Sequence, residues 1–181
     1  MNVEIARLSS STLTIATLSE ILIEVVANGG SVSFMHPLAP DMAASFWTRS
    51  LAAADAGKRV VLGASLDGAL VGTVTLDLDS PPNQAHRADI AKLMTKVRSR
   101  GLGVARTLML EAERIAIAEG RTLLTLDTAA EDGAAPLYER LGYEFVGEIP
   151  DYALKPHGGL TGTLIYFKRI GAAAGASQGS R

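Results

Sequence analysis

The stretch from Arg87 to Asp127 constrains the fold of this chain more than any other. Residues 87–95 are strand-like, and a helical run from Val104 to Glu119 follows them, closed by Gly120. The apolar residues of this run recur at a three-four spacing that is typical of an amphipathic helix, at positions 104, 105, 108, 112, 115 and 116. Leu123–Leu126 is then a short apolar run, typical of a strand buried on both faces. The order strand, helix, strand predicts two parallel strands joined by a crossover helix.

The chain before this unit is predicted to begin with a strand and two helices. Val3–Leu8 alternates apolar and polar residues, as a half-buried strand does. Candidate N-cap residues at 9–12 precede an apolar helical run that ends at Asn28-Gly29-Gly30. A second helix is expected from about Asp41 to Ala56, with three side chains facing inward, those of Phe46, Trp47 and Leu51.

A β-hairpin is predicted between the second helix and the crossover unit. Val60–Leu66 and Leu70–Leu78 are strand-like runs, and Asp67-Gly68 between them is a strong signal for a tight turn. The two runs should therefore pair with each other and with the strand at 87–95, as a meander.

The last part of the chain is predicted to close the sheet. Ala134–Leu141 is a short helix stopped by a glycine, and strands are expected at 143–147 and 164–168. We expect an irregular connection over 150–162, and a flexible tail of Gly, Ala and Ser residues over 171–181.

The order of elements predicts a mixed α/β fold, and composition favours one domain. The chain has 181 residues, of which 48% are hydrophobic, and we expect residues 1–170 to form a single core. Seventeen Lys and Arg against nineteen Asp and Glu give a weak overall field, so neither nucleic acid nor a membrane surface is an expected partner.

Several kinds of site and location are disfavoured by residue usage. The absence of cysteine excludes disulfides and cysteine nucleophiles. His36, His86 and His157 have no metal-ligand spacing, so we expect no metal site. Neither a basic-then-apolar leader nor an apolar run of about eighteen residues is present, so a cytoplasmic location is the default expectation.

The turn from Arg100 to Ala105 is the segment most suggestive of chemistry. Glycines at 101 and 103 leave backbone N–H groups uncovered, and the following helix start adds unpaired donors and a positive dipole end. A diphosphate would fit such a cradle. The Walker pattern lacks its Gly-Lys-Ser/Thr, and the dinucleotide pattern fails at Arg106. A tight turn without ligand remains the alternative interpretation of the glycines.

Two motifs in order resemble the GNAT superfamily of N-acetyltransferases. Arg100-x-x-Gly103-x-Ala105, preceded by Lys92-Leu93-Met94, resembles its acetyl-CoA motif, and residues 134–143 resemble its second signature. The resemblance implies a mostly antiparallel sheet with one parallel strand pair that splays at the acetyl-CoA site, flanked by helices. It also implies acetyl-CoA as cofactor and an amine acceptor. The sequence leaves the oligomeric state open, with a homodimer as one alternative.

The resemblance implies cofactor contacts on two strands, the turn and the short helix. A backbone N–H near Met94 or Thr95 is expected to meet the thioester carbonyl, and a β-bulge there would re-aim that group. The expected cofactor-binding residues are Leu93, Met94, Thr95, Arg100, Gly101, Leu102, Gly103, Val104, Ala105, Arg106, Thr128, Pro136 and Tyr138.

Three residues are the candidates for catalysis. Tyr138 matches the tyrosine that protonates the leaving sulfur in the family, and the alternative is an ordinary core aromatic. Asp89 and Asp127, expected on adjacent strands, are candidates for removing the amine proton or binding the ammonium. Their structural alternatives are a solvent-facing strand residue for Asp89 and a loop cap for Asp127.

The expected acceptor is a primary amine of a small metabolite, antibiotic or toxin. Two other functions stay open on the sequence: acetylation of a protein or peptide, and binding of an acyl-CoA without catalysis.

Overall fold

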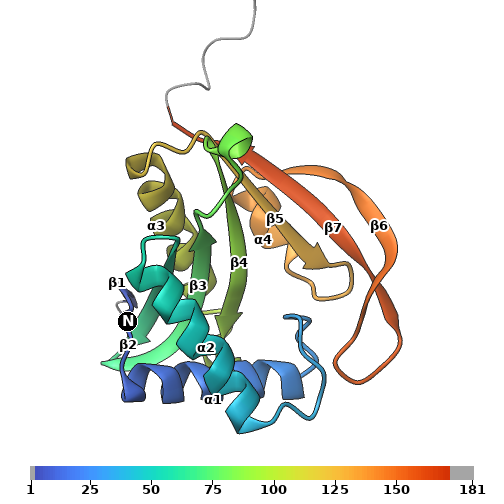
Figure 1. The fold of residues 1–181 in the computed structure, drawn as a ribbon. Coiled ribbons are helices and arrows are strands. Elements are labelled where there is room, and N and C mark those ends of the chain that lie inside the picture. Colours follow the sequence, from blue (N-terminus) through green and yellow to red (C-terminus); the bar gives the residue numbers. More distant parts are fainter. Residues whose placement is uncertain (1–2, 172–181) are drawn as a thin grey trace, which may run out of the picture.

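The computed structural model of the protein describes residues 3–171, which form one seven-stranded sheet with helices on both faces (Figure 1). The predicted tail lies outside these residues, apart from Gly171. The helices are α1 (Thr12–Ala27), α2 (Pro40–Asp55), α3 (Val104–Ala118) and α4 (Ala135–Arg140), and the strands are β1 (Val3–Arg7), β2 (Arg59–Leu66), β3 (Ala69–Asp77), β4 (Arg87–Thr95), β5 (Leu123–Ala129), β6 (Glu144–Leu154) and β7 (Leu160–Arg169).

The sheet is antiparallel except at one strand pair. Its order is β1-β2-β3-β4-β5-β7-β6, and β4 and β5 are the parallel neighbours, joined by the crossover helix α3. The predicted mixed sheet with one parallel pair is therefore confirmed. Pairing between β4 and β5 covers Arg87–Ile90 and Leu123–Leu126. Beyond these residues β4 pairs with β3 and β5 pairs with β7, so the two parallel strands separate as the sequence motifs led us to expect.

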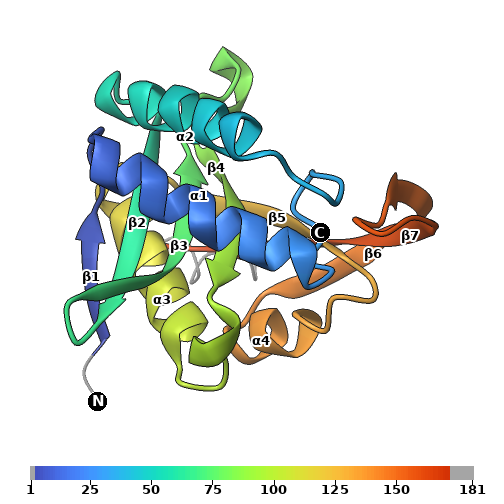
Figure 2. The ribbon, with the colours of Figure 1, turned by 90° about the horizontal axis from the view of Figure 1, so that it is seen from below.

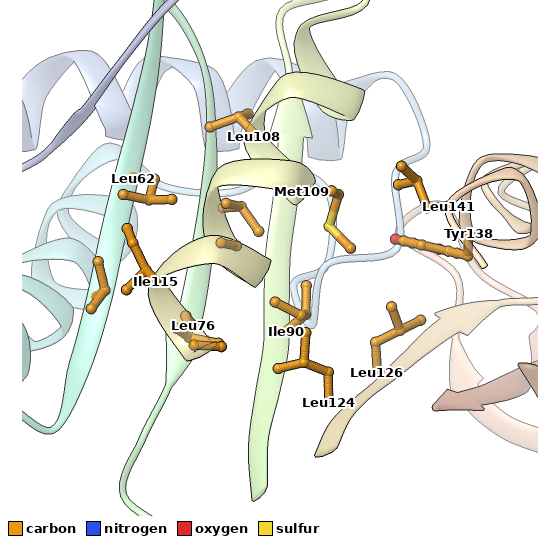
Figure 3. Close-up of a cluster of buried hydrophobic side chains, with 14 of the residues drawn as sticks. Leu62, Leu76, Ile90, Leu108, Met109, Ile115, Leu124, Leu126, Tyr138 and Leu141 are labelled. Atoms are coloured by element: carbon orange, nitrogen blue, oxygen red, sulfur yellow. The ribbon is translucent and has the colours of Figure 1, made fainter. Parts of the chain in front are cut away.

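Two hydrophobic layers hold the helices on the sheet. On one face α3 packs through fully buried side chains that include Leu108, Met109 and Ile115 (Figure 3). On the other face α1 and α2 pack through a second cluster that includes Leu18 and Trp47 (Figure 2). Full burial of one such aliphatic side chain stabilises the fold by roughly 1.5–3 kcal/mol, so the apolar spacing read from the sequence fixes which side of each helix meets the sheet.

Local signals in the sequence explain where several elements begin and turn. The Ser11 hydroxyl accepts a hydrogen bond from the Thr14 N–H at 3.0 Å and so caps α1. Asp67 and Gly68 have φ angles of 50° and 79°, the positive values that a two-residue hairpin of type I′ needs at both positions. The predicted hairpin between β2 and β3 is confirmed.

The prediction that the strand after α3 is buried on both faces was wrong. Leu124 and Leu126 are buried, whereas Leu123 and Thr125 on the opposite face are only half-buried. The reason is that α1 and α2 pack mainly against β2, β3 and β4 on that face and do not extend over Leu123 and Thr125 of β5.

The predicted irregular connection over 150–162 was also wrong. Strands β6 and β7 form one long hairpin, and the chain leaves the sheet only between Leu154 and Leu160. Pro150 is accommodated because β6 is the last strand of the sheet and is irregular between Ile149 and Ala153, so no neighbour requires its missing N–H. A proline in a run of residues therefore marked an edge strand rather than a loop.

Candidate active site

A cavity of about 480 Å³ opens where β4 and β5 separate. One wall is the end of β4, and the opposite wall is the end of β5 together with α4. The segment that follows α1 closes one side. The lining residues that bear on the argument are Ser31, Ser33, Lys92, Leu93, Met94, Thr95, Arg100, Ala105, Asp127, Thr128, Glu131, Asp132 and Tyr138.

A bulge in β4 reshapes the wall of this cavity. Thr73 pairs with Met94 and Thr75 with Ala91, so β4 carries one more residue than β3 between these pairs. Lys92 lies in the bulge with a φ of 53°. The bulge reverses the alternation of side chains, because Ile90 lies in the core under α3 and Met94 lies in the core under α1 and α2. A bulge near Met94 or Thr95 was considered on the sequence alone, and the structure has one just before these residues, with Leu93–Thr95 on the cavity wall.

The glycine turn presents free backbone N–H groups beside the cavity. Gly101 and Gly103 have φ angles of 76° and 80°, and a Cβ added at either residue would meet no atom within 4 Å. Gly103 is the N-cap of α3. Within the described part of the chain, the N–H groups of residues 101–106 donate no hydrogen bond to a loop carbonyl or a side chain. Those in the first turn of α3 also lack an acceptor within the helix, because a helix start has no preceding turn. An anion placed here would meet several donors and the positive end of the helix dipole.

Tyr138 reaches the cavity from α4. It is 6% exposed, and its hydroxyl points toward the space between β4 and β5 (Figure 3). Burial, and then the negative charges of Asp127 and Asp132, raise the pKa of Tyr138 to about 12. The phenol therefore keeps its proton at neutral pH. Its ring also packs on Tyr143 and Tyr166, with centroid separations of 6.0 and 5.9 Å, so the side chain is part of the core and also reaches the cavity.

Asp127 stands at the point where β5 leaves β4. Its carboxylate accepts a hydrogen bond from the Thr163 hydroxyl at 3.2 Å, and it lies on the cavity wall with its side chain exposed. Among residues 3–171 no cationic side chain forms an ion pair with it. A carboxylate of this kind can receive an ammonium group or a proton from the cavity.

The structure does not bring Asp89 to the same place. Asp89 is paired with Thr125, at the end of β4 and β5 where the two strands are still joined, and it does not line the cavity. Its carboxylate is bound by the Arg87 guanidinium and by the Thr125 hydroxyl. The sequence placed Asp89 and Asp127 on adjacent strands correctly, but it carried no information on where along their length the strands separate.

The predicted cofactor residues fall into two groups. Those that line the cavity are Leu93, Met94, Thr95, Arg100, Ala105, Thr128 and Tyr138. Gly101, Leu102, Gly103 and Arg106 lie exposed at the turn outside it, Pro136 is exposed at the start of α4, and the Val104 side chain is buried in the core. None of these six residues lines the cavity itself.

Sequence reasoning missed the segment after α1 and the acidic residues Glu131 and Asp132, all of which line the cavity. Asn28-Gly29-Gly30 was interpreted only as a helix terminator, yet residues 28–33 form one side of the cavity. Asp132 anchors this segment, because its carboxylate accepts the Ser31 N–H at 3.1 Å. The contact joins residues 101 positions apart, and no local pattern could indicate it.

Comparison with known proteins identifies the family. The acetyltransferase (GNAT) family matches over residues 31–143. The chain belongs to this family. The matched range contains the β4 bulge, the glycine turn and α4, which are three of the parts of the structure around the cavity.

Solved structures share the GNAT fold across nearly the whole chain. A ribosomal-protein-alanine N-acetyltransferase from Brucella melitensis is 20% identical, with a TM-score of 0.79 over 92% of this chain and 99% of that one. An N-acetyltransferase from Staphylococcus aureus Mu50 is 16% identical, with a TM-score of 0.78 over 93% and 99%. The yncA protein of Salmonella typhimurium, solved with its cofactor acetyl-CoA, is 15% identical, with a TM-score of 0.75 over 94% and 96%.

GNAT acetyltransferases use acetyl-CoA, and the residues of this chain fit that cofactor. The N–H groups at 101–106 suit its diphosphate, and the cavity behind them extends past Met94 to Tyr138. In the described part of the chain, no cluster of acidic or histidine side chains could hold a metal ion, and no helix is long and apolar enough to cross a membrane.

Proposed function

We propose that this GNAT protein transfers the acetyl group of acetyl-CoA to a primary amine of a small molecule. The observation that carries the proposal is the junction of two features at one cavity. The uncovered N–H groups of the glycine turn lie at its mouth, and Tyr138 and Asp127 both lie on its wall. A binding domain without catalysis would not need the second feature.

The glycine turn and Arg100 would hold the diphosphate, and the bulged strand would hold the acyl end. Backbone N–H groups near Met94 and Thr95 are re-aimed by the bulge at Lys92 and would donate to the thioester carbonyl oxygen. Such donors are rigid parts of the sheet, so they need no reorganisation when negative charge develops on that oxygen.

Bound acetyl-CoA supplies the thioester, whose C–S bond breaks as the amine nitrogen forms the new C–N bond. Tyr138 would donate its phenolic proton to the departing sulfur, because its raised pKa keeps that proton in place until it is needed. The proton released by the amine would pass to Asp127 or to solvent, after which Tyr138 is reprotonated. No covalent enzyme intermediate is required, in agreement with a chain that lacks cysteine.

We place the acceptor at the part of the cavity lined by residues 31–33, Lys92, Asp127 and residues 131–132, and call this part the acceptor end. Its surroundings favour a small molecule. The tip of the β6–β7 hairpin is fastened to two segments beside this end, since Lys155 forms an ion pair with Glu131 at 3.0 Å and the His157 ring bonds to the Ala27 carbonyl oxygen at 3.0 Å. An extended peptide would need an open groove at this position. Acetylation of a protein remains the second candidate, supported only by the fold shared with the Brucella ribosomal-protein-alanine enzyme.

A toxin or antibiotic is the acceptor that we would test first. Lys92-Leu93-Met94, Leu126-Asp127-Thr128 and Ile165-Tyr166-Phe167-Lys168 resemble segments of the tabtoxin resistance acetyltransferase. The resemblance supports tabtoxin-like amines as members of a test panel beside ordinary metabolites.

We also propose that the protein forms a homodimer through β6. This strand is the edge of the sheet and exposes a row of large apolar side chains: Phe145, Val146, Ile149, Tyr152 and Leu154. Light scattering at several concentrations tests this part of the proposal, and a monomer at all of them would contradict it.

A thiol-release assay tests the proposed activity. The purified protein is incubated with acetyl-CoA and a panel of small amines, and free coenzyme A is followed with time. Saturable, amine-dependent release is expected. Acetyl-CoA binding without release for any amine would favour a binding domain, and release with an N-terminal peptide alone would favour protein acetylation.

A further inference from the structure

Two residues of the cavity wall have an unusual backbone conformation. Among residues 3–171, the non-glycine residues with positive φ are Ser33 at 74°, Asp67 at 50°, Lys92 at 53° and Asp151 at 53°. Asp67 belongs to the β2–β3 turn and Asp151 to the irregular part of β6. Serine and lysine rarely adopt positive φ, unlike glycine, asparagine and aspartate. Such backbone strain persists where the surrounding structure enforces it, often at functional sites.

Ser33 and Lys92 also contact each other across the cavity. The Lys92 ammonium donates a hydrogen bond to the Ser33 hydroxyl at 3.0 Å, and it lies 5.8 Å from the centre of the Phe46 ring. An ammonium has three N–H donors, so two remain after the bond to Ser33. The two strained residues therefore place a cation and a hydroxyl side by side at the acceptor end.

The charges of this end of the cavity are not balanced in pairs. Glu131 forms its ion pair with Lys155, and Asp132 accepts the Ser31 N–H. In the described part of the chain, no carboxylate lies within ion-pair distance of the Lys92 ammonium. In the same part, no cationic side chain lies within that distance of the Asp127 carboxylate. Among residues 3–171, Lys92 and Asp127 thus face the cavity without an ion-pair partner, Asp132 has only a backbone donor, and Arg100 belongs to the glycine turn.

Burial makes the unpaired ammonium costly. It lowers the pKa of Lys92 from its ordinary value, against the opposing effect of Asp127, and the Arg59 charge adds to the lowering. An anionic group in the cavity would restore the electrostatic balance, because a desolvated charge is stabilised by a hydrogen-bonded partner.

We propose that the Lys92 ammonium and the Ser33 hydroxyl bind a carboxylate of the acceptor while Asp127 receives its amine. The substrates are then amino acids, or compounds that keep an amino-acid-like ammonium and carboxylate. The inference rests on the proposed acetyl transfer to a small amine and specifies its acceptor class. Lys92 acts here on specificity and takes no part in proton transfer.

Matched pairs of acceptors test the inference. L-Leucine is compared with 3-methylbutylamine, and L-lysine with cadaverine, because the members of each pair differ by one carboxylate. We expect kcat/KM of the wild type to favour the amino acid by at least about tenfold in one or both pairs, since a site with unpaired polar groups rejects a ligand that leaves them unpaired.

Variants assign the preference to Lys92. Lys92→Met should abolish it by raising KM for the amino acid, with the acetyl-CoA Kd unchanged, and Lys92→Arg should keep part of it. Lys58→Met is the matched control, because Lys58 is exposed and paired with Asp79 outside the cavity. Methionine retains a side chain at the positive φ, so Lys92→Met adds no backbone strain.

Three results would overturn the inference, and they differ from failure of the proposed function. Equal kcat/KM within both pairs would show that no carboxylate is recognised. A fall in kcat for both members in Lys92→Met would make Lys92 a proton-transfer group. If Lys92→Met kept the preference for the amino acid and Ser33→Ala lost it, Lys92 would not bind the carboxylate and would only hold Ser33 in place. Absence of thiol release with all four amines would instead contradict acetyl transfer itself.

Discussion

The backbone N–H of His36 donates a hydrogen bond to the carbonyl oxygen of Pro156 at 2.9 Å. The bond joins the segment between α1 and α2 to the tip of the β6–β7 hairpin, beside the rings of His36 and His157, which pack at a tilt of 46° with their centres 4.5 Å apart. The two chain segments are 120 residues apart in sequence, and we place them at one boundary of the proposed acceptor end, next to the cavity-lining residues 28–33.

This boundary predicts an effect of His157→Ala on the acceptor alone. The His157 ring must donate through Nε2, because its partner at Ala27 is a carbonyl oxygen that can only accept. Loss of one such bond costs about 1 kcal/mol, so we expect the acceptor KM to rise about fivefold with the acetyl-CoA Kd unchanged. His86→Ala, outside the cavity, is the control. An unchanged acceptor KM in His157→Ala would show that the hairpin tip does not contribute to acceptor binding.

Tyr138→Phe tests the acid. A general acid contributes about 100-fold or more, so kcat should fall by that order while the acetyl-CoA Kd measured by calorimetry changes little. Phenylalanine keeps the ring contacts with Tyr143 and Tyr166, and thermal unfolding should confirm an intact core. Tyr152→Phe on the exposed edge strand provides the control. Equal kcat in wild type and Tyr138→Phe would remove Tyr138 from the acid role.

The raised pKa of Tyr138 predicts the alkaline limb of the pH profile. A phenol with the ordinary pKa of about 10 would be half ionised at about pH 10, so kcat would already begin to fall as the pH rises toward that value. Because the pKa of Tyr138 is raised to about 12, the protonated acid persists to higher pH. We expect kcat to stay level between about pH 8 and about pH 10, with a saturating acceptor. A decline in this range that disappears in Tyr138→Phe would contradict the assignment.

Gly103→Val separates the backbone cost from the ligand effect. Gly103 and Gly57 have φ angles of 80° and 72°, and a Cβ at either would meet no atom within 4 Å. Valine should therefore destabilise the protein by a similar amount at both, about 1–2 kcal/mol. Only Gly103→Val should weaken acetyl-CoA binding, by about tenfold or more, because its side chain would occupy the space beside the free N–H groups. Equal acetyl-CoA affinity in the two variants would contradict a diphosphate site at the turn.

Asp127→Asn and Asp89→Asn should act on different properties. Asp127 faces the cavity, so its amide variant should lower kcat/KM for the amine by about tenfold or more. Asp89 is bound by Arg87 and Thr125 outside the cavity, so its variant should lower the melting temperature and leave kcat/KM nearly unchanged. The reverse pattern would show that the reacting groups meet at the joined end of β4 and β5.

The periodic elements could be predicted because their signals are local. Helix α3 was expected over 104–119 and is found over Val104–Ala118, and the strand expected over 87–95 is β4. In each case the apolar spacing and the flanking glycine or turn residues lie within the element itself. The glycine turn was found for the same reason, since its conformation depends on Gly101 and Gly103.

The acceptor end could not be predicted because it is assembled from distant segments. Ser33 meets Lys92 across 59 residues, and Lys155 meets Glu131 across 24. The exclusion of Asp89 depends on the point where β4 and β5 separate, which is set by pairing with β3 and β7. Neither relationship leaves a pattern within one stretch of sequence.

The most direct test of the central claim is a heteronuclear amide NMR titration of the protein with acetyl-CoA. The account predicts that the N–H resonances of residues 101–106 shift downfield on binding, because these donors gain hydrogen bonds to the diphosphate. Saturable binding that leaves these six resonances unmoved, or no binding at all, would contradict it.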